Sequence, residues 1–320
     1  MTDEPIPAAK AKPDKAVCQW VNRHQALGEF AGFGGKTQSA NHIKPLHWYV
    51  ACRLVVEGGF HPDDIVPRPP FRVERHRGSG ALRLHFDPAL GGGGERTVLG
   101  GLKTKNVDVV VAKDGIGPVL AVSCKGVTKA FRNLTNRMEE TIGECTNLHI
   151  TYPALVLGYL VLIRANKAIP LEALSQAGDE AAEPGVQLEK NDLAMQEGGE
   201  PVAGILRFHN ALRELTGRRG IRDDVSQYEA VSLGMVDMDA GSLGDLLDSY
   251  PDQASALRFE QFFDTLYLRY DERYVFSAPD LKRLTGRLEW ADNSPAFVDL
   301  PDLDYEPRLF AGAASDPSDD

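Results

Sequence analysis

The residues with the clearest chemical potential in this sequence lie between Lys103 and Glu140, where two acids and a lysine occur as Asp108, Lys125 and Glu139. Two carboxylates can hold a divalent ion such as Mg²⁺ through their oxygens, and the bound ion can supply hydroxide at neutral pH. A lysine beside the ion can stabilise negative charge that develops on a phosphoryl group. This combination of residue types predicts a metal-dependent site that hydrolyses phosphodiester bonds.

Two short runs rich in β-branched residues must position the first acid and the lysine. Asn106–Val111 and Val119–Cys124 each predict a strand, and the Asp-Gly and Gly-Pro steps between them predict a turn. Because side chains alternate along a strand, Ser123 and Lys125 share one face. Antiparallel pairing then places Asp108 opposite Ser123 or Lys125, so that acid and amine come together on one face of a hairpin.

A helical period follows the second strand and carries the second acid. Apolar residues recur there in three- and four-residue steps, and Asn133 can cap the start of the helix. The apolar stripe consists of Leu134, Met138, Ile142, Cys145 and Leu148. Glu139 falls on the opposite, polar face near Arg132 and Asn136, whereas Glu140 lies about 100° further round. Glu139 is therefore the preferred second acid.

Asp108, the step Ser123–Lys125 and Glu139 together resemble the PD-(D/E)xK restriction endonucleases. The resemblance is to the variant in which SxK replaces ExK and the second acid lies on the following helix, as in enzymes that cut around a CCGG core. Arg137–Glu139 matches the Arg-x-Glu step of that branch, while Val107 stands where the family usually has a proline. The resemblance covers roughly residues 40 to 165.

This resemblance implies an α/β fold with a restriction-endonuclease-like mixed central sheet flanked by helices. It implies that Mg²⁺ is held by Asp108 and Glu139, with a main-chain carbonyl near Cys124 completing the shell. Lys125 would lie beside the attacking water and the scissile phosphate. A glutamate on the helix before the hairpin supports a second metal ion or its water in such enzymes, and Glu57 is in a suitable place for that role.

Each of these residues also has a structural interpretation. An acid and a lysine on adjacent strands commonly form a solvated ion pair, and Glu139 can pair with Arg132 or Arg137 on an ordinary polar helix face. Glu57 can simply be a residue at a helix end, and the Ser123 hydroxyl, although part of the candidate catalytic set, is a weak metal ligand. The alternatives are therefore a DNA-binding or assembly protein that keeps the fold without cutting, and a repair or mobile-element nuclease.

Charge supports contact with double-stranded DNA only locally. The chain as a whole has a formal net charge of −11, which argues against indiscriminate coating of nucleic acid. Residues 103 to 138 hold seven basic side chains against two acids, a balance of +5 that suits a phosphate-binding surface. The candidate DNA contacts from this segment and from a Pro- and Arg-rich stretch upstream are Lys103, Lys105, Lys129, Arg132, Asn136, Arg137, Arg72, Arg75 and Arg77. A third basic stretch, residues 218 to 222, could supply base-reading arginines.

The remaining sequence bounds the type of protein. The expected organisation is a disordered segment at 1–14, a single nuclease domain at 15–310 with an acidic surface insertion near 170–202, and a disordered acidic tail at 311–320. No apolar run reaches the length of a membrane span, and four cysteines without CxxC spacing fit the cytoplasm. Gly35–Thr37 lacks the first glycine of a P-loop, so no nucleotide cofactor is expected. Palindromic DNA sites mirror two-fold symmetry, which favours a homodimer or homotetramer.

The other predicted elements complete an α/β layout. Residues 15 to 60 should form two helices around a Gly-rich link, and strands are expected near Ala81 to Phe86, at Ala154 to Ile163 and near Tyr228 to Asp237. Further helices are expected near Val202 to Thr216 and Ala254 to Tyr270.

Overall fold

A mixed five-stranded sheet forms the centre of the protein. The computed structural model describes residues 17–34, 41–75, 81–167, 190–300 and 302–311. The strand order is β1-β6-β7-β8-β9, in which β1, β6 and β7 pair antiparallel and β7, β8 and β9 pair parallel. The strands are β1 (Ile65–Val66), β6 (Val109–Lys113), β7 (Gly117–Val127), β8 (Val156–Arg164) and β9 (Ala230–Val236). The predicted α/β class, with a mixed central sheet flanked by helices, is confirmed.

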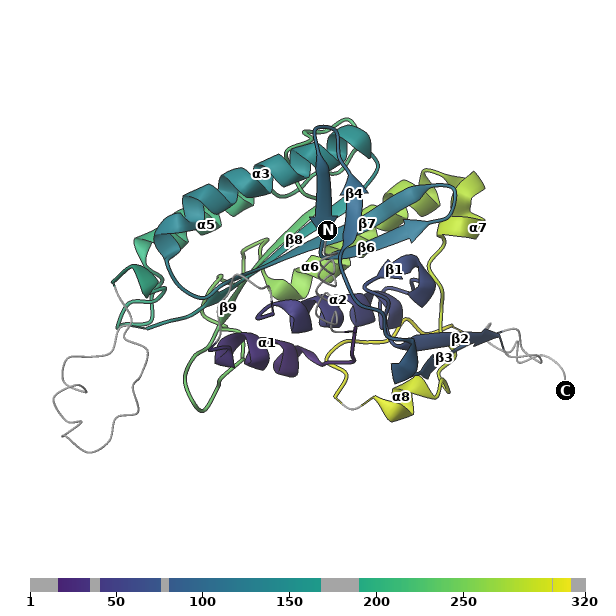
Figure 1. The fold of residues 1–320 in the computed structure, drawn as a ribbon, viewed down its shortest axis with the longest axis horizontal. Helices are drawn as coiled ribbons and strands as arrows, with labels where there is room; N and C mark the ends of the chain where they lie inside the picture. Colours follow the sequence, from purple (N-terminus) through teal and green to yellow (C-terminus); the bar gives the residue numbers. More distant parts are fainter. Residues whose placement is uncertain (1–16, 35–40, 76–80, 168–189, 301, 312–320) are drawn as a thin grey trace, which may run out of the picture.

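Helices cover both faces of this sheet (Figure 1). One face packs against α3 (Leu134–Thr151) and α5 (Ala203–Glu214), and the other packs against α1 (Arg23–Gly32), α2 (Lys44–Val56) and α6 (Phe259–Tyr270). The strands β8 and β9 carry buried side chains on both faces, as expected of parallel strands between two helical layers. The predicted helices and strands in these regions are confirmed, although α6 begins five residues later than Ala254.

The predicted hairpin is present, but its first strand is divided. Pairs such as Val109↔Val122 and Val111↔Leu120 give β6 and β7 the expected antiparallel register, and glycines with positive φ close the turn. The prediction of one continuous strand over Asn106–Val111 is wrong. The chain bends at Asp108, because the residues before it pair in a separate two-stranded ribbon.

That ribbon was not predicted from the sequence. It consists of β4 (Arg96–Leu99) and β5 (Thr104–Val107), joined by a short turn next to α3. A second ribbon pairs β2 (Phe71–Arg75) with β3 (Leu82–Phe86), so part of the Pro- and Arg-rich stretch forms a strand. After α6 the chain continues through a π-helix (Asp271–Phe276) to the short helices α7 (Lys282–Thr285) and α8 (Ala296–Asp299).

The helix α2 is unusual because it is buried on almost every side. Eleven of its thirteen residues are buried, including His47 and Arg53. A helix that is enclosed all round must satisfy or pair any polar side chain that it carries. Arg53 meets this requirement through Glu57 and the ring of Phe263, with its guanidinium carbon 4.0 Å from the ring centroid.

A buried ionic cluster ties the start of β9 to the π-helix. Glu229 is fully buried and accepts from Arg218 at 2.7 Å and Arg273 at 2.8 Å, with His149 at 3.5 Å. Arg218 is 0% exposed, so the suggestion that it reads bases does not hold for this side chain. Its role is to neutralise a buried carboxylate.

Several sequence expectations lie outside the described residues. These are the disordered segment 1–14, most of the acidic insertion 170–202, the tail from 312 onward, the Gly35–Thr37 segment and Arg77. Across the described ranges, no helix is long and apolar enough to cross a membrane. All four cysteines are free thiols in buried positions.

Candidate active site

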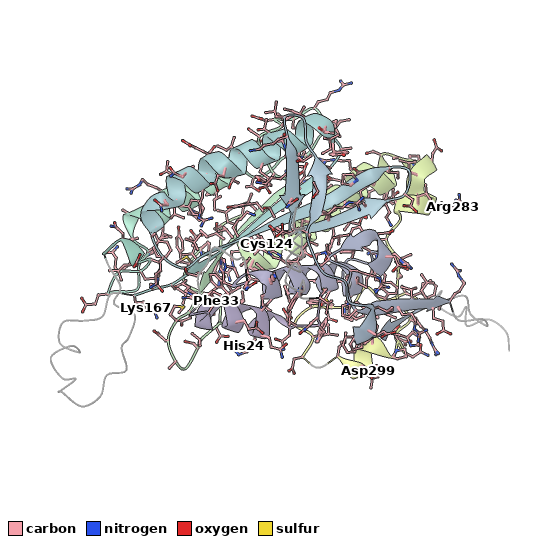
Figure 2. The ribbon with its side chains drawn as sticks, in the orientation of Figure 1. His24, Phe33, Cys124, Lys167, Arg283 and Asp299 are labelled. Carbon is pink, nitrogen blue, oxygen red and sulfur yellow. The ribbon has the colours of Figure 1, made fainter. Side chains whose placement is uncertain are left out.

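Asp108 is held by the SxK step of the neighbouring strand. Its Oδ2 accepts a hydrogen bond from the backbone N–H of Cys124 at 2.7 Å, from Lys125 Nζ at 3.1 Å and from Ser123 Oγ at 3.5 Å. Asp108 is 7% exposed and lies where the chain passes from β5 into β6. Its hydrogen-bond partner Cys124 lies near the centre of the molecule (Figure 2). The predicted meeting of the acid and the amine is confirmed, with Asp108 continuing the register opposite Ser123.

The surroundings of Lys125 keep its ammonium protonated. Burial alone would lower the pKa of its ammonium, but the charges of Asp108 and Glu144 outweigh that effect and raise the pKa above its ordinary value. About a third of its side chain, 31%, remains exposed, so the ammonium can reach a bound anion. A lysine in this state stabilises developing negative charge and cannot act as a general base at neutral pH.

The pair lies at a pocket of about 610 Å³ with a basic lining. Four basic side chains line it against two acids, Glu95 and Asp108. The basic residues are Lys103, Lys105, Lys125 and Arg137, so three of the predicted DNA contacts meet at the predicted catalytic pair. In a chain of net charge −11, this is a local positive surface suited to an anionic ligand.

Glu144 of α3 is a buried acid next to this pocket that sequence reasoning missed. It is 5% exposed, and its Oε2 lies 2.7 Å from Nζ of Lys105. Its Oε1 is buried without a hydrogen-bond partner in the described part of the chain. Because a buried carboxylate oxygen without a partner is costly, this atom is a candidate to bind a cation or an ordered water.

The same helix fixes the ribbon that carries the pocket lysines. Asn147 accepts from the backbone N–H groups of Leu102 and Lys103 and donates to the carbonyl of Lys103. A side chain at Gly100 would collide with Asn147, since its Cβ would lie 2.0 Å from the amide nitrogen. The turn of the ribbon is thereby locked onto α3, one helical turn from Glu144.

Two histidines complete the surroundings, His42 just before α2 and His47 in its first turns. His42 lines the pocket, and its Nε2 lies 3.4 Å from the carbonyl oxygen of Gly126. His47 is 5% exposed, with Nε2 3.8 Å from Asp108 Oδ1. Burial is the main cause that lowers the pKa of both imidazoles, so both are neutral at pH 7. Nδ1 of His42 and Nε2 of His47 have no hydrogen-bond partner within the described ranges.

Other predicted residues do not come to this pocket. Glu139 and Asn136 are exposed on α3, Lys129 is exposed in the loop before it, and none of the three lines the pocket. The side chain of Arg132 lies outside the described part of the chain. The physical reason for the position of Glu139 is the rotation of α3, which turns Thr141 and Glu144 toward the sheet instead.

Glu57 is engaged elsewhere. It accepts two hydrogen bonds from Arg53, at 2.6 and 2.8 Å, and one from the hydroxyl of Tyr267 at 2.9 Å. These bonds satisfy the carboxylate within the core around α2 and α6. Glu57 does not line the pocket, so its expected support of a second metal ion finds no geometric basis.

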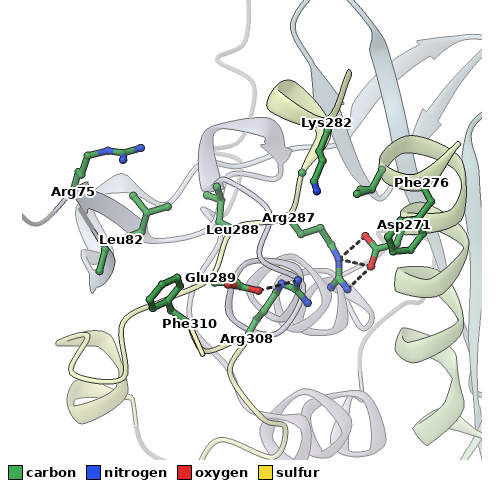
Figure 3. A pocket seen from close by; sticks show the side chains of 13 residues that line it. Arg75, Leu82, Asp271, Phe276, Lys282, Arg287, Leu288, Glu289, Arg308 and Phe310 are labelled. Atoms are coloured by element: carbon green, nitrogen blue, oxygen red, sulfur yellow. Dashed lines mark hydrogen bonds and ion pairs between the residues drawn. The ribbon is translucent and has the colours of Figure 1, made fainter. Parts of the chain in front are cut away.

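Arg72 and Arg75 lie on the β2–β3 ribbon, outside the pocket that holds Asp108. Arg75 lines a different pocket of about 630 Å³ (Figure 3). In that pocket Arg287 is paired with Asp271 at 2.7 Å, and the guanidinium of Arg308 is 3.3 Å from Glu289. Internal acids therefore neutralise much of its positive charge.

The donor set at the candidate site provides few protein ligands for a metal ion. Among the described residues, no three His, Cys, Asp or Glu side chains come together as a metal site. Asp108 with its free Oδ1, and Glu144 with its free Oε1, fit the usual binding of Mg²⁺ through one or two carboxylates with waters and substrate phosphate as the other ligands. The Cys124 thiol lies in the core beneath α2, and its main-chain carbonyl remains only a proposed ligand.

Comparison with known proteins gives no match: no family model, no curated protein and no solved structure is significantly similar to this chain. The resemblance to the PD-(D/E)xK endonucleases therefore depends on the motif residues themselves.

Proposed function

We propose that this protein is a Mg²⁺-dependent, site-specific endonuclease of double-stranded DNA that acts as a homodimer or homotetramer. The observation that supports this proposal best is the buried carboxylate of Asp108, held by the Ser123–Lys125 step beside a pocket lined by basic side chains. An ordinary surface ion pair would be exposed to solvent on both sides. Here the acid is buried and retains one oxygen that faces away from the lysine.

Each side chain of the pocket has a place in phosphodiester hydrolysis. Lys103, Lys105 and Arg137 would bind the phosphates on either side of the cleavage point. Lys125 would compensate the negative charge that builds up on the scissile phosphate, because its ammonium stays protonated. A bound Mg²⁺ would supply a hydroxide at neutral pH and share that charge.

Asp108 and Glu144 are the acids that we assign to the metal ion, with Glu144 in the place that the sequence pattern gave to Glu139. Asp108 keeps a fixed orientation, since three donors hold its Oδ2. Glu144 combines burial with an oxygen that lacks a partner among the described residues, whereas Glu139 is exposed. Ser123 acts through Asp108 as a positioning residue.

The test compares wild type with Asp108→Asn and Lys125→Ala on supercoiled plasmid and phage DNA, with Mg²⁺ or with EDTA. The matched control is Lys113→Ala, because Lys113 also pairs with an acid, Asp64 at 2.7 Å, in the same hairpin but outside the pocket. We expect discrete fragments from wild type and from the control, lost in EDTA and in both site variants. DNA binding measured by fluorescence anisotropy should survive in Lys125→Ala.

Three results would redirect the assignment. Undiminished cutting by Lys125→Ala would remove this site from catalysis. Binding without cutting of either unmodified or methylated DNA would favour a DNA-binding or assembly protein. Cutting that depends on DNA ends or branched structures, without a fixed sequence, would favour a repair or mobile-element nuclease.

A further inference from the structure

The two oxygens of Asp108 face different surroundings. Oδ2 receives all three hydrogen bonds from the β7 segment, whereas Oδ1 points toward His47 on α2. The distance from Oδ1 to His47 Nε2 is 3.8 Å, too long for a hydrogen bond. Asp108 is therefore a carboxylate with one occupied and one available oxygen.

His47 presents an unused nitrogen to that available oxygen. Its side chain is 6% exposed, and its Nε2 is buried without a hydrogen-bond partner in the described part of the chain. Leaving such a polar atom unpaired in the protein interior is unfavourable. A buried atom of this kind calls for an occupant that the protein side chains do not provide.

A single metal ion can bridge these two atoms. An ion bound at about 2.1 Å by each atom spans the observed 3.8 Å with a ligand–metal–ligand angle of about 130°. A water with bonds of about 2.8 Å to both atoms would need an angle of about 85°, well below the tetrahedral value.

We infer that His47 Nε2 and Asp108 Oδ1 together hold a divalent metal ion, and that the nitrogen ligand makes the site bind Mn²⁺ more tightly than Mg²⁺. This inference deepens the proposed nuclease function, on which the role of Asp108 rests. Mg²⁺ strongly prefers oxygen ligands, whereas first-row transition metals also accept imidazole nitrogen. His47 and Asp108 hold the ion in the absence of DNA, and Glu144 of the proposed site, waters or phosphate oxygens supply the remaining ligands.

The histidine ligand is tested by metal binding without DNA. Mn²⁺ is titrated into wild type and His47→Gln and followed by the electron paramagnetic resonance signal of free Mn²⁺, and Mg²⁺ is then added as a competitor. The glutamine keeps an amide donor near Asp108 but lacks the imidazole lone pair. In His47→Gln we expect the affinity for Mn²⁺ to fall at least about tenfold, because a ligand of the ion is lost. The affinity for Mg²⁺ should change by less than about threefold.

The matched control is His85→Gln. His85 also carries a buried Nε2 without a hydrogen-bond partner among the described residues, but the acid beside it, Glu74, is 56% exposed and lies outside the pocket that holds Asp108. Mn²⁺ affinity should be unchanged in this variant. Electron spin-echo modulation of the wild-type Mn²⁺ complex should show a directly bound ¹⁴N, which gives a measurement that does not depend on any variant folding.

Equal Mn²⁺ affinity in wild type and His47→Gln, or a wild-type complex without ¹⁴N coupling, would overturn the inference. The nuclease proposal can fail separately. If Mn²⁺ binding depends on His47 but no DNA is cut with either metal, the metal site stands and the nuclease function does not. If DNA is cut and His47→Gln binds Mn²⁺ normally, the nuclease function stands and the histidine ligand does not.

Discussion

The choice between Glu144 and Glu139 as the second acid gives the sharpest single prediction. In Glu144→Gln the side chain keeps its shape and an acceptor for Lys105, so only the charge is lost. Lys105 is 31% exposed and can be solvated, which limits the cost in stability to about 1–2 kcal/mol. The melting temperature should then fall by only a few degrees, at about 2–4 °C per kcal/mol.

The effect on activity should be much larger than the effect on stability. Loss of the Glu144 charge removes a ligand for the metal ion and removes one of the charges that raise the pKa of Lys125. We expect the rate of plasmid nicking in Mg²⁺ to fall at least about 100-fold, which corresponds to ~2.7 kcal/mol of transition-state stabilisation. Glu139→Gln, by contrast, should change the rate by less than about twofold.

The assay measures conversion of supercoiled to nicked and linear plasmid at saturating Mg²⁺, with melting curves for every variant. Glu140→Gln is a second exposed control on the same helix. A larger loss of activity in Glu139→Gln than in Glu144→Gln would refute the assignment of Glu144. It would show instead that α3 presents its exposed face to the metal when DNA is bound.

Three further predictions concern charge and stability. Lys105→Ala should weaken DNA binding and reduce the slope of log K against log salt by about one unit, measured by anisotropy at several salt concentrations. Glu229→Gln should lower the free energy of unfolding in urea by about 3–5 kcal/mol, because Arg218 and Arg273 would be left buried without their acid. Burial alone would raise the pKa of Glu229, but its hydrogen bond from His149 and the charge of Arg273 lower it below the ordinary 4.5. The stabilisation by Glu229 is therefore present above pH 4.5 and is lost as the pH falls through the lowered pKa. The free energy of unfolding in urea should accordingly fall steeply in that acid range for wild type but not for Glu229→Gln.

The hairpin and the helix of the site could be predicted because their signals are local. β-branched runs on either side of an Asp-Gly turn specify the pairing of β6 with β7, and alternation along the strands then brings Asp108 to Lys125. The apolar period likewise located α3 within its true bounds. The hairpin and the helix both depend on residues within one short segment of the sequence.

The division of the first strand could not be predicted, because no residue near Asp108 breaks a strand. Asn106–Val111 contains four valines, which favour continuous extended structure. The bend arises because β5 pairs with β4, and this pairing depends on the turn that joins them, residues 100 to 103. That pairing is stabilised by Asn147 on α3, more than forty residues away in the chain.

Glu144 was missed for a related reason. The predicted stripe of α3 included Ile142, which is exposed, whereas Glu144 is buried together with Thr141 and Cys145. An acid on a buried helix face is unfavourable unless a partner is present, and the partner here is Lys105 on a ribbon that the sequence did not reveal. Thr141, Glu144 and Asn147 follow one another at intervals of three, and this polar row was the signal that could have identified the face.

The position of Asp108 between two sheets has a consequence for how the site is held. The ribbon of β4 and β5 ends at Asp108, where the central sheet begins. The carboxylate of Asp108 is bound to β7 of the central sheet. Lys103 and Lys105 of the ribbon are bound instead to Asn147 and Glu144 of α3. The side chains that would bind a ligand and the carboxylate that would fix its reacting centre are therefore adjacent in the chain but are held in place by two different elements, α3 and β7.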